Sequence, residues 1–185
     1  LFMGILCAYI IALTRYCGGQ TPRVGALVAN RDTPESVQTV GLLRSFIVIA
    51  KQVSLAVSPI SNLKNIVDDV TASVRNQRVP YEAVDELMNR DGIDATFAAI
   101  FSFEGQSWTQ ELELGSQTLE PFVHRFADIE DARKANGMEM SLELRNNGGT
   151  AVGRLTYQAE LFDEKTVLRL REWFYEAIDS LVATV

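Results

Sequence analysis

The stretch Leu1–Tyr16, LFMGILCAYIIALTRY, decides the fold because it is apolar almost throughout. Read as a helix, it is hydrophobic on nearly every face, so it must be buried between other elements. It is too short to span a bilayer, which requires about 20 residues, and no basic segment precedes it as in a signal peptide. Gly18 and Gly19 then permit the left-handed geometry that ends a helix. Because no initiating Met is present, we also expect the chain to be part of a larger protein.

Two strands are predicted outward from this helix. Val24–Ala29 (VGALVA) is typical of a short interior strand, and Leu42–Val53 contains the β-branched run Ile47–Ile49, which predicts a second buried strand. The polar stretch Asn30–Thr39 between them is predicted to be a loop.

A pair of helices is predicted next. Pro59 fits the first turn of a helix, with Ser58 as its N-cap. Tyr81–Met88 forms a second, shorter helix after a break at Pro80. Apolar residues at three- and four-residue spacing mark the inner face of the first helix: Ile60, Leu63, Val67, Val70 and Val74.

The remaining pattern predicts a strand, a hairpin and a last helix. Met138–Arg145 alternates apolar and polar residues, as in a half-buried strand, and Asn146–Gly149 is a strong turn signal. Asp163 is expected to cap a helix that runs to Val185, and no internal repeat or linker divides the chain. The other two predicted strands are Ala95–Phe103 and Val152–Ala159, which completes an α/β lobe with a layered mixed sheet.

Composition excludes several classes of function. Hydrophobic residues make up 47% and charged residues 22%, which is ordinary for a globular domain. The net charge of -7 and the lack of a basic stripe argue against nucleic-acid and membrane partners. Cys7 and Cys17 have neither redox-pair nor metal-site spacing, so we interpret them as reduced thiols of a cytoplasmic protein.

Catalytic patterns are nearly missing from the sequence. His124 is the single histidine, and its apolar neighbours favour a packed side chain over a general base. A metal site would need carboxylates gathered from distant segments. Gly148–Gly153 lacks the following Lys of a phosphate loop and precedes a strand, so a hairpin turn explains it better. We therefore predict no catalytic residue and no metal site.

Six spaced segments of the chain form a further pattern. Val24–Arg31 (VGALVANR) and Asn76–Glu82 (NQRVPYE) resemble the "vvGtpvanR" strand and the "HQDvPFE" motif of condensation domains in nonribosomal peptide synthetases. The other matching segments, in family order, are Ile11–Tyr16 ("LLarytG"), Val40–Phe46 ("iGfFvNT"), Met138–Leu142 ("fDLtl") and Leu155–Asp163 ("leYntdLFd"). Each motif alone is weak, and the alternative is an unrelated α/β domain with coincidental matches.

The resemblance implies a fold like one lobe of chloramphenicol acetyltransferase, with residues 1–185 as the C-terminal half of a V-shaped condensation domain. The family's HHxxxDG motif lies in the N-terminal lobe, and this sequence has no pair of adjacent histidines. The lobe is therefore expected to shape a tunnel but to be inactive alone. The implied partners are the N-terminal lobe and the peptidyl carrier and adenylation domains. The resemblance also implies that this lobe binds no cofactor directly, because the substrates are carried on the phosphopantetheine of the carrier domains.

Five positions are candidates for the tunnel or the inter-lobe surface under this resemblance. Asn30 and Arg31 end a buried strand, so they are expected either to reach the cleft or to hold the loop to Gly41. An arginine at this point could pair with a carboxylate of the other lobe, which we favour, or contact the substrate. The complete set is Asn30, Arg31, Gly41, Ser45 and Gln77.

Departures from the family's pattern leave alternatives open. Ser45–Phe46 replaces Asn-Thr, Asn76–Arg78 replaces His-Gln-Asp, Arg44 replaces an apolar residue, and Glu139 replaces Asp. The bulkier Phe46 could narrow a tunnel or pack in the core. A degenerate recruitment domain, an epimerisation or heterocyclisation relative, and a coenzyme A-dependent acyltransferase therefore remain alternatives. A separated lobe should also expose an apolar patch, which we expect to come partly from the first helix and partly from residues 104–136.

Overall fold

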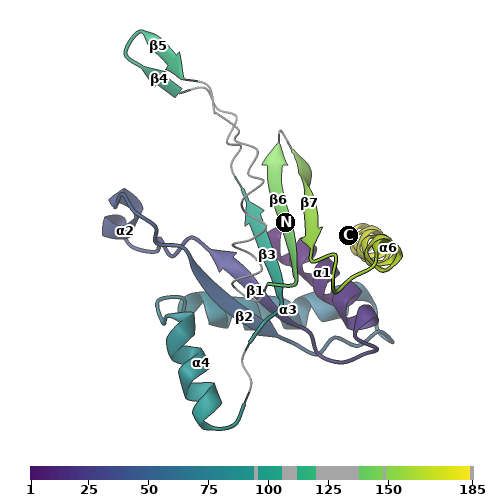
Figure 1. The fold of residues 1–185 in the computed structure, drawn as a ribbon. Coiled ribbons are helices and arrows are strands. Elements are labelled where there is room, and N and C mark those ends of the chain that lie inside the picture. The colour runs from purple at the N-terminus through teal and green to yellow at the C-terminus, as the bar shows by residue number, and fades with distance from the viewer. Residues whose placement is uncertain (94–95, 106–111, 120–137, 148, 184–185) are drawn as a thin grey trace.

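A five-stranded mixed sheet with the strand order β2-β1-β3-β6-β7 forms the centre of the structure (Figure 1). β1 (Arg23–Val28), β3 (Ala99–Glu104) and β6 (Met140–Asn147) run parallel to one another. β2 (Ser45–Ala50) and β7 (Thr150–Tyr157) are antiparallel to their neighbours and form the two ends of the strand order. The predicted α/β arrangement with a mixed sheet is confirmed.

The helices that accompany the sheet are α1 (Phe2–Tyr16), α2 (Pro34–Gln38), α3 (Pro59–Arg75), α4 (Tyr81–Arg90) and α6 (Glu164–Val182). A separate two-stranded hairpin consists of β4 (Leu112–Leu114) and β5 (Gln117–Leu119). This computed structural model describes residues 1–93, 96–105, 112–119, 138–147 and 149–183. Within these ranges, none of the helices combines the length and apolar character needed to cross a membrane.

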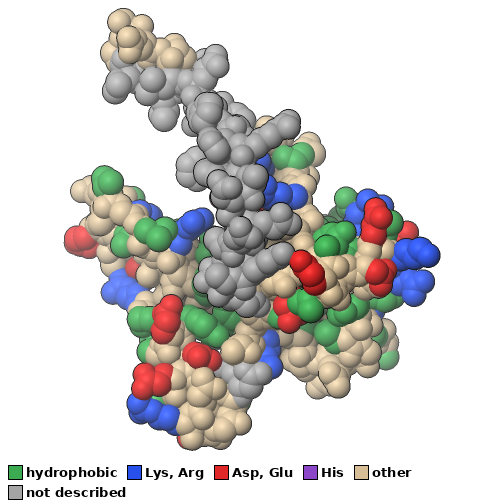
Figure 2. All heavy atoms as spheres, viewed as in Figure 1, with side chains coloured by type: hydrophobic (Ala, Val, Ile, Leu, Met, Phe, Trp, Pro, Cys, Tyr) green, Lys and Arg blue, Asp and Glu red, His purple; other side chains and the backbone are tan. Residues whose placement is uncertain are grey.

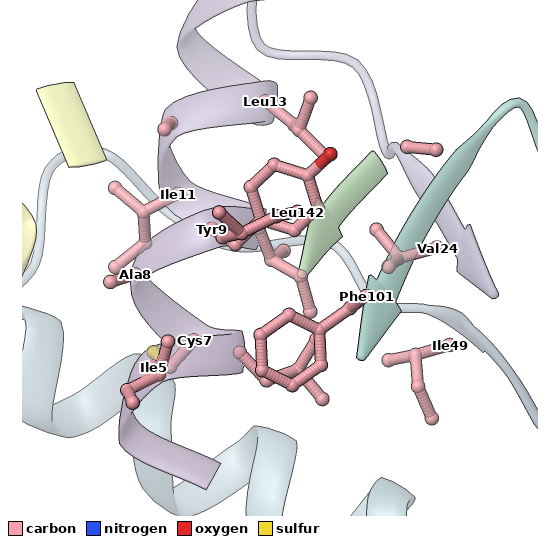
Figure 3. Packing of buried hydrophobic residues seen from close by; sticks show 14 of the residues in the cluster. Ile5, Cys7, Ala8, Tyr9, Ile11, Leu13, Val24, Ile49, Phe101 and Leu142 are labelled. Atoms are coloured by element: carbon pink, nitrogen blue, oxygen red, sulfur yellow. The ribbon is translucent and has the colours of Figure 1, made fainter. Parts of the chain in front are cut away.

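The core lies between one face of the sheet and the helices α1, α3 and α6. Every residue of α1 from Ile5 to Thr14 is buried, as its uniformly apolar sequence predicts. α1 packs against α6 and α3, and its Tyr9 faces Phe101 of β3 with ring centroids 6.3 Å apart (Figure 3). Alternate strand residues reach this face, including Val24 of β1 and Ile49 of β2.

One polar atom in this core has no hydrogen-bond partner. The Tyr9 side chain is completely buried, and its hydroxyl lies without a partner among the described residues. Burial raises the pKa of this hydroxyl far above its ordinary value, because the phenolate cannot be solvated there. The buried hydroxyl therefore lowers the stability of the folded protein relative to a purely apolar ring at the same position.

Two predictions about the loop after β1 are corrected. The polar stretch Asn30–Thr39 contains the helix α2, which begins with a capping box between Thr33 and Ser36. The periodicity rule misses it because none of its residues is buried. The predicted strand Leu42–Val53 is shorter, and it lies at an end of the strand order rather than inside it. Its Ile47 and Ile49 are nevertheless buried against the core.

Two predictions about helices are also corrected. The fully buried residue in the middle of α3 is Ile66, whereas the predicted Val67 is only partly buried. The first helix does not supply an exposed patch, because only its ends, such as Tyr16, are exposed. Most of residues 104–136, the other predicted source of that patch, lies outside the described residues.

Candidate functional site

The carboxyl ends of β1, β3 and β6 meet at one edge of the sheet, because the three strands are parallel neighbours (Figure 1). The loop of residues 29–44, which contains α2, leaves the sheet at this edge, and the β6–β7 turn lies there too. Ligand sites of open α/β sheets lie beyond the carboxyl ends of the strands. We therefore build the candidate site from this carboxyl edge.

The guanidinium of Arg31 holds the loop after β1 together. Its Nη1 donates to the carbonyl oxygen of Ser36 and, at 2.7 Å, to that of Thr39. Its Nη2 donates to the carbonyl oxygen of Gly41 at 2.9 Å. Carbonyls at the end of a helix need partners from outside it, and arginine can supply them. The loop-holding contact with Gly41 that the sequence suggested is therefore present.

An ion pair joins this loop to the turn between α3 and α4. Arg78 Nη2 lies 3.0 Å from Asp32 Oδ1, and Arg78 Nε donates to Asp32 Oδ2 at 3.1 Å. These hydrogen bonds from Arg78 lower the pKa of the Asp32 carboxyl below its ordinary value. Two segments that are far apart in the sequence, residues 30–32 and 76–78, therefore meet at the carboxyl edge.

The five sequence-predicted positions are associated with the carboxyl end of β1. Asn30 follows β1 in the left-handed region, with a φ of 53°. Ser45 pairs with Val28, the last residue of β1, and the buried Gln77 precedes the arginine of the ion pair. The positions linked in this way to one end of the strand are Asn30, Arg31, Gly41, Ser45 and Gln77. Their role in a tunnel stays a prediction.

An aromatic cluster covers part of the sheet face that lies opposite the core. A Cβ at Gly25 would lie only 2.1 Å from the ring of Phe97, so this ring rests directly on the backbone of β1. The Phe97 ring also contacts Phe46, with centroids 5.3 Å apart, and Tyr81, with centroids 4.9 Å apart. The cluster attaches the start of α4 to β1 and β2. Phe46, the departure from the family's motif, packs here and not in the core.

Sequence reasoning missed Phe97, which it placed only within a predicted strand. The available signal was Gly25, because a glycine inside an apolar strand often marks a close approach by another group. Phe97 itself lies just before β3.

The same face becomes polar along β6 and β7. Ser141 Oγ donates to Glu143 Oε1 at 2.9 Å, and Arg154 donates to Glu143 Oε2 from Nε at 3.0 Å and from Nη2 at 2.8 Å. The predicted alternation of β6 is confirmed on its core face by Met140 and Leu142, which are buried. Ser141 was expected on the polar face, yet it is buried as well. Such a surface can bind polar groups, and Glu143 is shared there between the Ser141 hydroxyl and the Arg154 guanidinium.

Two kinds of catalytic group, metal ligands and thiols, can be examined in the part of the chain that the structure describes. No group of three or more His, Cys, Asp or Glu side chains in that part could hold a metal ion. Burial raises the pKa of the Cys7 thiol to about 12, which makes it a poor nucleophile. Cys7 and Cys17 are both free thiols, as predicted. His124 lies outside the described residues.

A small pocket of about 260 Å³ lies at the other end of the sheet, near the starts of β1, β3 and β6. Apolar side chains such as Tyr16 and Phe162 line it together with the polar Arg23, Thr96 and Glu139. Arg23 and Thr96 already interact with other groups of the protein. None of the five predicted positions lines this pocket, so the carboxyl edge remains the candidate site.

Comparison with known sequences and structures places the chain among related proteins. The sequence pattern of the family described as "Condensation domain" matches residues 1–185. Tyrocidine synthase 2 from Brevibacillus parabrevis is 24% identical over 186 residues, which cover 99% of this chain and 5% of that protein. Phosphinothricin tripeptide synthetase PhsC from Streptomyces viridochromogenes is 26% identical over 174 residues, covering 92% of this chain and 15% of that protein. The chain thus spans a small part of these curated relatives.

Solved structures share the fold. The condensation domain of the monacolin K polyketide synthase MokA superposes with a TM-score of 0.71 at 16% identity, over 96% of this chain and 40% of that one. The X-domain in the complex with OxyB from teicoplanin biosynthesis superposes with a TM-score of 0.70 at 15% identity, over 97% of this chain and 39% of that one. Residues 1–185 therefore match well under half of each neighbour.

Proposed function

The chain belongs to the condensation domain family, and from this membership we propose that it is the C-terminal lobe of an amide-forming condensation domain in a nonribosomal peptide synthetase. The family match over residues 1–185 carries the proposal, and the peptide synthetases among the relatives support it. The match to only 40% of a solved condensation domain leaves room for a second, N-terminal lobe.

In this proposal the lobe shapes a tunnel and leaves proton transfer to its partner. The acceptor amine attacks the carbonyl carbon of the donor thioester, a C–N bond forms and the C–S bond breaks, and the proton lost by the amine ends on the carrier's thiol, which leaves. Donor and acceptor both arrive on the phosphopantetheine arms of peptidyl carrier domains, which adenylation domains load. The carboxyl edge and the sheet face around Phe46 form the wall, and Arg31 pairs with a carboxylate of the N-terminal lobe. The lobe alone is inactive because it lacks the family's histidine motif.

Amide formation in the intact parent synthetase tests this function. With donor and acceptor carriers loaded, the wild-type protein should release the amide product, and Arg31→Ala should reduce the rate at least tenfold. Arg90→Ala is the matched control, because Arg90 makes an exposed ion pair with Glu86 on α4, away from the loop. The function is wrong if no loaded pair gives an amide while the adenylation and carrier domains work normally.

A recruitment domain is the second candidate. The fold resembles the OxyB-bound X-domain as closely as it resembles the MokA domain, and Asn76–Arg78 departs from the family's motif. A recruiter would yield no amide, but it would bind a tailoring enzyme encoded beside it, with a dissociation constant measurable by calorimetry. Turnover of free acyl-coenzyme A without carrier domains would instead identify an acyltransferase.

A further inference from the structure

The hydroxyl of Tyr9 is completely buried and has no hydrogen-bond partner among the described residues. Buried polar groups nearly always have a partner, so each exception calls for an explanation. The pocket of about 260 Å³ at the amino end of the sheet lies nearby, because Leu13 and Tyr16 of the same helix line it. We therefore ask whether this pocket can supply a partner for the hydroxyl.

The Tyr9 side chain is directed toward the pocket. It extends along α1 toward Leu13, one helical turn later, with the hydroxyl at the Leu13 end (Figure 3). The ring contacts Phe101 of β3. Ala99 lies two residues before Phe101, on the same face of the strand, and Ala99 lines the pocket. The hydroxyl therefore points from the level of Phe101 to the floor of the pocket.

The pocket has the composition of a site for a small, mostly apolar molecule. Its floor consists of the buried core residues Leu13, Ala99 and Met140. The rings of Tyr16 and Phe162 line its wall, with centroids 5.7 Å apart. Small-molecule sites are concave and mostly apolar, with a few polar groups that orient the ligand. Met140 is unbranched and adapts its shape readily, so a shift of this side chain can open the floor toward the buried hydroxyl.

The hydroxyl favours an uncharged ligand with a hydrogen-bond acceptor. Burial raises the pKa of Tyr9 far above its ordinary value, so the group stays protonated and can donate. A charged ligand would have to give up its hydration at the apolar floor, which costs far more than one hydrogen bond returns. A neutral carbonyl oxygen meets both requirements, because it accepts a hydrogen bond and has no net charge.

We propose that this pocket binds a small neutral carbonyl compound whose oxygen accepts a hydrogen bond from the Tyr9 hydroxyl. The apolar part of the compound lies against the rings of Tyr16 and Phe162. The site is at the end of the sheet opposite the carboxyl edge, so it is separate from the amide-forming site of the proposed function. Binding stabilises the folded lobe, because the ligand supplies the hydrogen bond that the buried hydroxyl lacks.

Protection of Cys17 in the intact parent synthetase tests the proposal. Cys17 is a partly exposed free thiol that lines the pocket, so its rate of reaction with iodoacetamide reports occupancy. Mass spectrometry of the Cys17 peptide measures this rate. Cyclopentanone is the probe, and cyclopentane, the same ring without the oxygen, is the matched control ligand. We expect saturating cyclopentanone to slow the reaction of Cys17 at least fivefold, and cyclopentane to protect it more weakly.

Two tyrosine variants isolate the hydrogen bond. Tyr9→Phe removes only the buried hydroxyl, and it should raise the half-protecting concentration of cyclopentanone at least threefold, as expected for the loss of one hydrogen bond. Tyr175→Phe is the matched control, because Tyr175 is exposed on α6 and does not line the pocket. It should leave the half-protecting concentration unchanged. Without ligand, Tyr9→Phe should melt at the wild-type temperature or above it.

Four results would overturn the proposal. In the first, cyclopentanone does not protect Cys17 at any concentration that leaves the protein folded. In the second, cyclopentane protects Cys17 as well as cyclopentanone does, so the pocket is purely apolar. In the third, the wild type and Tyr9→Phe are protected equally, so the hydroxyl takes no part. In the fourth, Tyr9→Phe melts below the wild type without ligand, so the hydroxyl already has a partner. Amide formation enters none of these measurements, so the proposed function can fail or stand independently.

Discussion

Helix α1 and the loop of residues 29–44 both carry apolar side chains, but these side chains lie in opposite environments. In α1 the intrahelical hydrogen bonds satisfy the backbone, and the apolar side chains are buried by the sheet, α3 and α6. In the loop, the side chain of Arg31 satisfies the backbone while the apolar groups remain in water. The first arrangement stabilises the fold, and the second leaves Val37, Val40 and Leu42 exposed on an ordered loop, on the projection where Figure 2 shows hydrophobic side chains. Apolar sequence alone does not distinguish the two.

The largest expected effect is in the core. Phe101→Ala removes a fully buried ring that contacts Tyr9 and Phe2, so the free energy of unfolding should fall by about 3–5 kcal/mol. Val40→Ala should change it by less than about 0.5 kcal/mol, because that side chain is already in water. Urea unfolding of the parent protein, monitored by hydrogen exchange of the α1 amides, measures both changes in the free energy of unfolding. Equal losses of unfolding free energy in the two variants would contradict this contrast between the core and the loop.

The aromatic cluster should give the next largest effect. Gly25→Ala places a methyl group against the ring of Phe97, and overpacking of this kind costs about 1–3 kcal/mol. Phe97→Ala should make the Gly25→Ala change nearly neutral, because the clashing ring is then gone. A double-mutant cycle on thermal unfolding measures the coupling. Additive losses would mean that Phe97 does not rest on β1.

Loss of Arg31 should loosen the loop without disturbing the core. Arg31→Ala removes the donor from three carbonyls, two of which are exposed and can bind water instead, so we expect a loss of only about 0.5–1.5 kcal/mol. Amide exchange should accelerate in residues 33–42 and stay unchanged in α1. Arg31→Lys should restore only part of the stability, because an ammonium cannot reproduce the planar fork. An unchanged melting temperature together with lost amide formation would contradict this structural role and would favour a contact between Arg31 and substrate.

The smallest expected effect is the pH dependence of the Asp32–Arg78 pair. Arg78 lowers the pKa of Asp32 in the folded protein below its ordinary value of 3.8. The contribution of the pair is therefore complete above that value and disappears as the pH falls through the lower, folded-state pKa. Asp32→Asn should lower the melting temperature slightly at pH 7. The difference in melting temperature from wild type should vanish once the pH is below the folded-state pKa of Asp32. Arg78→Ala should cause the same loss, and a difference that persists in acid would contradict the pairing.

The sequence predicts elements well where one physical pattern dominates. The all-round apolar run of α1 and the Asp163 cap of α6 are strong, local signals, and the structure confirms them. The alternation in β6 is confirmed for Met140 and Leu142 but not for Ser141, which is also buried. The helix α2 was missed because its start is a capping interaction with no buried face behind it. The packing of Phe97 on Gly25 was missed because this contact joins two residues 72 positions apart, and local sequence patterns do not predict such contacts.

The candidate site was predictable as a set of positions but not as a set of contacts. The resemblance to motifs singled out Asn30, Arg31, Gly41, Ser45 and Gln77, and the structure associates all five with one strand end. The sequence suggested that the loop is held to Gly41, but it did not indicate that Arg31 also binds the carbonyls of Ser36 and Thr39, nor that Asp32 and Arg78 meet. Those contacts depend on how the β1 loop and the α3–α4 turn pack in three dimensions, and spacing along the chain contains no such information.

The position of β2 at an end of the sheet has a consequence for the solubility of the chain. Its sequence Ser45–Ala50, SFIVIA, is uncharged, free of proline and glycine, and rich in β-branched and aromatic residues, which is the signature of a segment prone to fibrillar stacking. Arg44 and Lys51 flank it directly, and charges at such places keep strands of different molecules from joining edge to edge. We therefore expect Arg44, the arginine that departs from the family's motif, to reduce aggregation through β2.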